Sequence, residues 1–163
     1  MARAVCQALA ERGWPIDPVT LRNGFVAARW PGRLQQLTWR GIPLLLDGAH
    51  NPPAALALRH ELDAHPERYG LKPGPRHWVI GMLANKQGPE ILRLLLAEGD
   101  RAWIVPVPDH ASWSCAQLVE ACPEHAPDLL TSADLEQAIN SAFNEKKTRI
   151  ILTGSLYLLA KLI

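Results

Sequence analysis

The stretch LDGAHNP, residues 46–52, ends an apolar run that starts at Pro43 and opens a segment of helical periodicity. An apolar run that ends at an acid and a glycine, with a helix directly after it, is typical of the turn from a buried strand to a helix. Asn51 is suited to cap that helix, and Pro52 fits its first turn. The stretch therefore predicts a strand–turn–helix unit, the building block of an α/β sheet.

Strand and helix patterns go on alternating to the end of the chain. Regular alternation of this kind predicts a Rossmann-like α/β domain, a mostly parallel sheet with helices on both faces. Two short helices, 2–12 and 17–28, are expected before this domain, with Asp17 as N-cap of the second. The turn Arg40-Gly41 suggests that the first two strands form a hairpin at one side of the sheet. The expected strands are 34–39, 42–46, 77–82, 102–107, 128–130 and 149–152, and the expected helices of the domain are 53–64, 89–97, 114–121, 133–146 and 155–163.

Composition is typical of a globular protein and argues against several kinds of partner. With 163 residues, 48% of them hydrophobic, the chain is long enough to bury a core. Its 17 basic and 16 acidic residues form no long run, and no apolar stretch approaches the roughly 20 residues of a membrane span, so we expect no nucleic-acid or membrane partner. The cysteines Cys6, Cys115 and Cys122 lack CxxC spacing, which predicts reduced thiols in a cytoplasmic protein without a metal site of its own.

Polar residues in the loops after the expected strands are the candidate ligand-binding residues, because ligands of open α/β sheets gather at the carboxyl ends of the strands. After the second strand, Asp47 can accept hydrogen bonds from a ribose-type hydroxyl, and His50 and Asn51 offer donors at a helix N-terminus that favours anions. This set suits a nucleotide or a charged reaction centre. A capping turn with a solvated histidine would explain the same residues, and both interpretations stay open here.

Three further candidates come from other loops. Lys86, between two glycines after the third strand, can pair with a carboxylate or phosphate, although most loop lysines are simply solvated. Ser155 opens the last helix, where it can cap the helix or, with free backbone N–H groups, hold a carboxylate. Arg33 precedes the first strand, and its planar guanidinium suits a phosphate or a purine face, whereas an arginine after a Pro-Gly turn is more often exposed.

Missing motifs narrow the classes of function. No GxGxxG follows a strand, which disfavours a dinucleotide-dependent oxidoreductase, and no GxxxxGK[ST] is present to form the usual phosphate-binding loop. Ser155 has no GxSxG context, which disfavours a hydrolase.

Four motifs occur in an order and at distances that resemble the C-terminal part of folylpolyglutamate synthase, called dihydrofolate synthase in its bifunctional form, a member of the Mur ligase superfamily. DGAHNP and TGSLYL are specific as a pair. The resemblance implies that residues 1–29 are a helical remnant of the end of a central ATPase domain and that residues 30–163 are the Rossmann-like C-terminal ligase domain. The four motifs are WPGRLQ (30–35), LLLDGAHNP (44–52), GMLANK (81–86) and ILTGSLYL (151–158).

That family joins L-glutamate to a folate or pteroate substrate, using ATP with Mg2+ and an acyl-phosphate intermediate. The resemblance implies that Arg33 and Asp47 contact the base and ribose of ATP. It also implies that His50 and Asn51 face the reacting phosphate and the incoming glutamate. Ser155 would help to hold the glutamate carboxylate, and Lys86 is a further candidate for that role.

The chain departs from the family in two ways. Asn85-Lys86-Gln87 stands where the family usually has Asp-Lys-Asp, so two charges beside the lysine are missing. The family's phosphate-binding loop, magnesium ligands and pterin pocket belong to an N-terminal domain, so we expect the chain to be a fragment that is inactive by itself. Its two N-terminal helices would then expose apolar faces and can self-associate. The alternative is a free-standing module that binds a nucleotide or an amino acid without catalysis.

Overall fold

The computed structural model describes residues 2–163, which divide into two compact units, one ending at Trp30 and the other running from Pro31 to Ile163. The first unit holds the helices α1 (Ala2–Glu11) and α2 (Pro18–Ala27), and neither helix buries a side chain. The Thr20 backbone N–H donates to the Asp17 carboxylate over 2.8 Å. Both predicted N-terminal helices and the predicted cap are thus confirmed.

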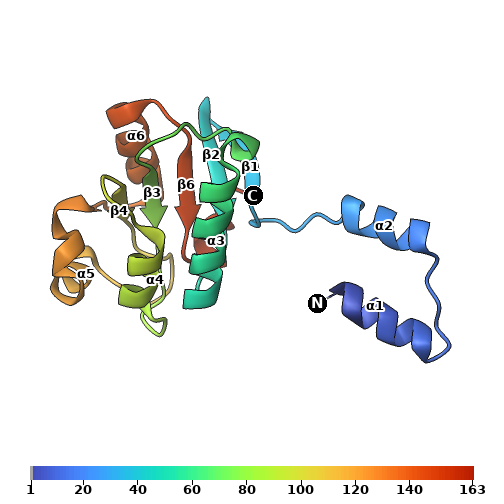
Figure 1. Ribbon diagram of the computed structural model, residues 1–163. Helices are drawn as coiled ribbons and strands as arrows, with labels where there is room; N and C mark the ends of the chain where they lie inside the picture. The colour runs from blue at the N-terminus through green and yellow to red at the C-terminus, as the bar shows by residue number, and fades with distance from the viewer. Residues whose placement is uncertain (1) are drawn as a thin grey trace. The chain divides into compact units, whose positions relative to one another are not determined.

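The second unit is built on one six-stranded sheet in the order β1-β2-β6-β3-β4-β5 (Figure 1). β1 and β2 form the expected antiparallel hairpin, and the other neighbouring pairs are parallel. Positive φ angles at Arg40 (47°) and Gly41 (84°) are the geometry that a tight two-residue hairpin turn requires. The strands are β1 (Gln35–Trp39), β2 (Ile42–Asp47), β3 (His77–Ile80), β4 (Arg101–Ile104), β5 (Leu129–Thr131) and β6 (Ile150–Thr153).

Helices cover both faces of this sheet, as predicted. Three helices pack on the face that contains Leu45 and Trp78, and two pack on the face that contains Leu46 and Trp103. The strands from β2 to β6 each contribute to both cores because successive residues point to opposite faces, whereas β1 contributes only Leu37 and Trp39, to the second core. The first group is α3 (Pro52–Ala64), α4 (Gly88–Leu95) and α5 (Cys115–Ala121), and the second is α6 (Leu135–Lys146) and α7 (Leu156–Leu159). Two short 3₁₀ helices, η1 (Pro66–Tyr69) and η2 (Pro123–Asp128), complete the unit.

Several expected elements are shorter in the structure. The helix predicted at 155–163 is the single turn α7, because the backbone after it closes i→i+3 bonds, such as Leu162 N–H to Leu159 O (2.9 Å). The strands predicted at 77–82 and 102–107 end at Ile80 and Ile104. From Met82 on, the backbone after β3 bonds to the 105–114 loop instead, as in the Trp113 N–H to Met82 O bond of 2.9 Å.

A buried carboxylate ties the amino ends of β3 and β4 to α3. Asp100 is 1% exposed and accepts hydrogen bonds from Arg59 Nη1 (2.7 Å), Trp78 Nε1 (3.0 Å) and the Arg76 backbone N–H (2.7 Å). A buried charge is tolerated when it is paired and its oxygens are hydrogen bonded, as they are here.

Replacing Asp100 with alanine is expected to lower the free energy of unfolding by about 3–5 kcal/mol, since Arg59 and Trp78 lose their buried acceptor. Urea unfolding followed by tryptophan fluorescence measures the change. Asp63→Ala is the matched control, because Asp63 also pairs with Arg59 but its side chain is 48% exposed. We expect that variant to lose under about 1 kcal/mol. Equal losses in the two variants would contradict the role assigned to Asp100.

Candidate functional site

The loops that carry the candidate residues meet at the end of the sheet where the parallel strands have their carboxyl ends. Asp47 at the end of β2 pairs in register with Thr153 at the end of β6, and Thr153 pairs with Ile80 at the end of β3. β1 runs antiparallel to β2, so its start, next to Arg33, lies at the same end. The convergence expected from the parallel topology is therefore present.

His50, Lys86 and Ser155 line one cavity of about 400 Å³. They come from three separate loops, those that follow β2, β3 and β6. The remaining lining residues are Leu83, Gly154, Leu156 and Tyr157. The three residues predicted to be catalytic thus share a cavity, while their chemical roles stay predictions.

The imidazole of His50 is oriented by its own loop. Nδ1 lies 2.8 Å from the Gly48 carbonyl oxygen, which can only accept a hydrogen bond. Nδ1 therefore carries a proton, and Nε2 is the nitrogen left free for a ligand. Through Nε2 the half-buried ring can accept a hydrogen bond when neutral and donate one when protonated.

Asp47 and Arg33 form a pair beside the cavity. Asp47 is 6% exposed, its Oδ2 accepts the Leu34 backbone N–H over 3.0 Å, and its Oδ1 lies 3.7 Å from Arg33 Nη1. Burial raises the pKa of the Asp47 carboxyl, and the Leu34 N–H and the Arg33 guanidinium oppose that rise. The carboxylate thereby fixes the loop before β1, while the Arg33 side chain stays 42% exposed and open to a ligand.

Ser155 acts as a helix cap within the cavity wall. It is 3% exposed, and its Oγ accepts the Tyr157 backbone N–H over 3.2 Å. The preceding Gly154 has φ 104°, and a Cβ there would lie 2.5 Å from the Gly81 carbonyl oxygen. The Thr-Gly-Ser turn thus requires glycine, and it brings the loop after β6 against the loop after β3.

Lys86 is held in place by a loop that is distant in the sequence. Trp113 Nε1 donates to the Lys86 carbonyl oxygen (2.9 Å), and the Ala84 backbone N–H donates to Ala111 O (2.9 Å). No carboxylate within residues 2–163 pairs with the half-buried Lys86 side chain, so its ammonium group is free to meet an anion.

Asn51, like Arg33 and Asp47, does not line the cavity. Its Oδ1 accepts the Ala54 backbone N–H over 2.9 Å, so it caps α3. The capping interpretation of Asn51 is confirmed, and its contact with a nucleotide stays a prediction.

Two residues of this region were not predicted from the sequence. Tyr157 lines the cavity and stacks on His110, with ring centroids 4.2 Å apart and an interplanar angle of 27°. Tyr157 stands two residues after Ser155 in the TGSLYL motif, and this position could have indicated that it lies in the site. His110 offers no such signal, because its loop reaches the site through contacts between segments distant in the sequence, such as the bridge between Leu83 and Ser112.

The donors in the cavity suit anions better than cations. An imidazole, an ammonium and a hydroxyl favour carboxylate or phosphate, whereas Mg2+ prefers oxygen ligands that carry negative charge. Over the described residues 2–163, no group of three or more His, Cys, Asp or Glu side chains is placed to bind a metal ion. None of the helices in that range is long and apolar enough to cross a bilayer.

Comparison with known proteins gives consistent matches. Residues 32–163 match the family model of the C-terminal domain of dihydrofolate synthetase. Folylpolyglutamate synthase of Lacticaseibacillus casei is 30% identical over 151 residues, which cover 89% of this chain and 32% of that protein.

Solved structures agree with the sequence matches. Mycobacterium tuberculosis folylpolyglutamate synthase complexed with ADP and AMPPCP has a TM-score of 0.79 at 26% identity, covering 96% of this chain and 36% of that chain. The bifunctional folylpolyglutamate synthase/dihydrofolate synthase of Yersinia pestis complexed with AMPPNP and Mn ion has a TM-score of 0.72 at 29% identity, covering 91% and 34%. The chain thus spans about a third of the length of these relatives.

The family model covers nearly the whole second unit and includes all the residues that line the cavity. The fold of that unit is the one found in the solved relatives. The chain therefore belongs to the family of the dihydrofolate synthetase C-terminal domain, which confirms the resemblance drawn from its four motifs.

Proposed function

We propose that this chain is the C-terminal domain of an ATP-dependent ligase that adds L-glutamate to a folate or dihydropteroate through an acyl phosphate. The observation that best supports the proposal is the convergence of His50, Lys86 and Ser155 on one cavity, beside the Arg33–Asp47 pair. Complexes of the relatives with ADP, AMPPCP and AMPPNP support ATP as the nucleotide.

The proposed chemistry needs anions to be brought together. A substrate carboxylate takes the γ-phosphoryl group of ATP, and the glutamate amine then attacks the acyl carbon. The C–N bond forms as the C–O bond to phosphate breaks, and the proton that the amine loses leaves with inorganic phosphate. In this scheme His50 Nε2 faces the phosphate, while Lys86 and Ser155 hold the glutamate carboxylate by charge and by a hydroxyl donor. Holding the reactants in place supplies much of the rate enhancement.

Arg33 and Asp47 complete the nucleotide side of the proposal. The exposed guanidinium of Arg33 offers a flat cationic surface to the base, and Asp47 Oδ1 offers a lone pair to a ribose hydroxyl. Asn51 would contact the phosphates through its amide N–H groups, because its Oδ1 is used by the helix cap. We assign the ligands of Mg2+ to protein outside residues 2–163, where negative oxygen ligands have to be supplied.

We further propose that residues 1–29 form the end of the central ATPase domain of the full-length ligase. Their apolar side chains support this, since Val19 is 64%, Phe25 44% and Val26 68% exposed. Without that domain the same faces would favour self-association of the chain. The cytoplasmic location expected from the three free cysteines stays a proposal as well.

A chimera tests the proposed function. Residues 1–163 replace the matching third of the Lacticaseibacillus casei synthase, and ADP release is measured with and without glutamate and folate. We expect glutamate-dependent turnover from the chimera and none from the chain alone. Nucleotide binding without any turnover would favour the binding-module alternative.

Within that chimera, His50→Ala is expected to lower kcat by about a hundredfold or more, since the reacting phosphate loses its contact with Nε2. The dissociation constant of ATP, measured by calorimetry, should change much less. His60→Ala, on the exposed side of α3, is the control and should leave kcat unchanged. A His50→Ala enzyme within a few-fold of the unsubstituted chimera would refute the assigned role.

Ser155→Ala in the chimera is expected to raise the KM for glutamate about tenfold, the effect of losing one hydrogen bond to a charged group. The KM for ATP should stay nearly constant. Ser114→Ala is the control, because the Ser114 side chain also caps a helix, α5, but does not line the cavity. An unchanged glutamate KM would leave Ser155 as a helix cap only.

A further inference from the structure

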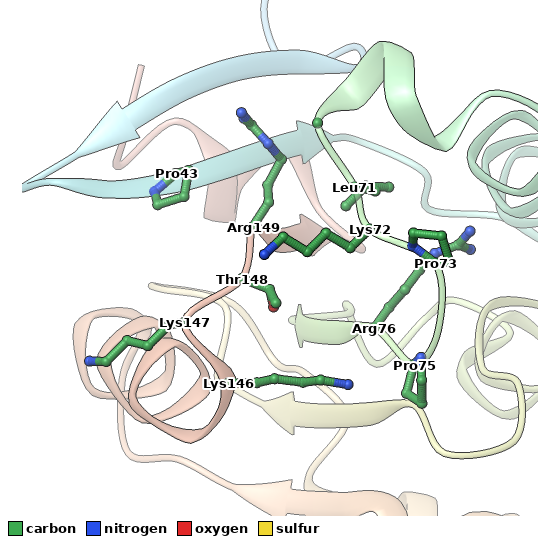
Figure 2. Close-up of a pocket in the computed structure, with 11 residues that line it drawn as sticks. Pro43, Leu71, Lys72, Pro73, Pro75, Arg76, Lys146, Lys147, Thr148 and Arg149 are labelled. Carbon is green, nitrogen blue, oxygen red and sulfur yellow. The ribbon is translucent and has the colours of Figure 1, made fainter.

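A second cavity lies at the other end of the strands, next to the amino ends of β3 and β6 (Figure 2). Its volume is about 290 Å³. Three segments form its walls: Pro43 at the start of β2, residues 70–76 before β3, and residues 146–149 before β6.

The lining of this cavity is strongly basic. Of the described residues that line it, five are cationic and none carries a carboxylate, although the chain as a whole balances 17 basic against 16 acidic residues. Such a lining concentrates positive potential in a concave surface. The five residues are Lys72, Arg76, Lys146, Lys147 and Arg149.

Arg149 carries a charge that no carboxylate within residues 2–163 neutralises. Its Nη1 donates to Leu44 O (2.9 Å), whereas its buried Nε has no hydrogen-bond partner among the described residues. Burial lowers the pKa of Arg149, yet a guanidinium stays protonated in proteins. A bound anion would offset the cost of this unpaired charge.

The lack of a side chain at Gly70 leaves space for the guanidinium of Arg149. Gly70 has φ 61°, and a Cβ at this position would lie 3.2 Å from Arg149 Nη2 and 3.3 Å from Nε. The close approach of the Gly70 backbone therefore encloses the arginine from the side of η1.

Two lysines point into the hollow from opposite walls. Figure 2 shows Lys72 and Lys146 extending across it from the 70–76 loop and from the end of α6, with Thr148 between them. Neither lysine forms an ion pair with another described residue. Lys147 points away, and its Nζ donates to Asn144 Oδ1 over 2.8 Å. Arg76 is already engaged by Leu62 O at 2.9 Å and by Asp63 at 2.7 Å.

We propose that this cavity binds a small multivalent anion of the phosphate class, either inorganic polyphosphate or the phosphate groups of a nucleotide. Lys72, Lys146 and Thr148 supply donors from two walls of the cavity, and Arg149 supplies a fixed charge. Ammonium and hydroxyl donors in this arrangement suit tetrahedral oxyanions. The volume lies at the lower limit of small-molecule sites, which fits a di- or triphosphate group. The site is separate from the proposed ligase cavity, and its test does not depend on that function.

Titration of the 15N-labelled chain with tripolyphosphate at low ionic strength tests the proposal. We expect saturable shifts of the backbone amides in 70–76 and 146–149, distinct from any at 83–86 or 154–157. The absence of shifts in the first two segments would overturn the site. Tricarballylate is the comparison anion, and binding as tight as that of tripolyphosphate would overturn the phosphate class.

Neighbouring lysines provide the matched variants. Lys146→Gln is expected to weaken tripolyphosphate binding about tenfold, whereas Lys147→Gln, with the same loss of charge, should weaken it less than about twofold. If both substitutions weakened binding equally, tripolyphosphate would be attracted by a diffuse basic surface, and the proposed site would be wrong. Circular dichroism checks that both variants keep the fold.

A third titration distinguishes the two sources of phosphate. ATP that binds tighter than tripolyphosphate would support a nucleotide, and weaker binding would support inorganic polyphosphate. Either result, with the shifts confined to 70–76 and 146–149, supports the site.

Discussion

At the carboxyl ends of β6 and β3, the backbone of Gly154 passes so close to Gly81 that any Cβ at residue 154 would collide with the Gly81 carbonyl oxygen. The Gly81 N–H also donates to Thr153 O over 3.2 Å. This contact holds the two strand ends together and makes the following loops leave the sheet side by side. The cavity that contains His50 and Ser155 lies where those loops separate, so the site depends on a backbone contact that only glycine permits.

A second close approach fixes the loop before β1 against the same edge. The Gly48 N–H donates to Gly32 O over 2.7 Å, and a Cβ on Gly48 would collide with the side chain of Leu156. Asp47, the residue before Gly48, adds a hydrogen bond, because its buried carboxylate accepts the Leu34 N–H. Because β2 also pairs with β6, all four sequence motifs are linked to one another by backbone contacts. A ligand at this edge would meet a largely preorganised surface, which reduces the entropy lost on binding.

Local signals in the sequence were sufficient for much of this arrangement. The caps at Asn51 and Ser155 follow from short-range chemistry, and the parallel sheet follows from alternation of strand and helix patterns, which together place the motifs at one edge. For Lys86, the sequence predicts only that it lies at the carboxyl ends of the strands. Its exact position depends on the hydrogen bond between its loop and Trp113, a contact between segments that are distant in the sequence. The basic cavity could not be predicted at all, since Lys72 and Arg149 are far apart in sequence and the net charge of +1 conceals their proximity.

In the proposed ligase, the charge of the candidate site explains why a second protein wall is needed. ATP, the activated substrate and glutamate all bring negative charge to one place, and their mutual repulsion must be reduced before reaction. The cavity offers an ammonium and an imidazole but no carboxylate, so it can attract these anions and cannot by itself hold a divalent cation. An acyl phosphate must also be kept from water, which a cavity on one face of a single domain does not achieve. A partner surface that carries the metal ligands and closes over His50 would satisfy both requirements, and closure of two domains is the usual way to provide it.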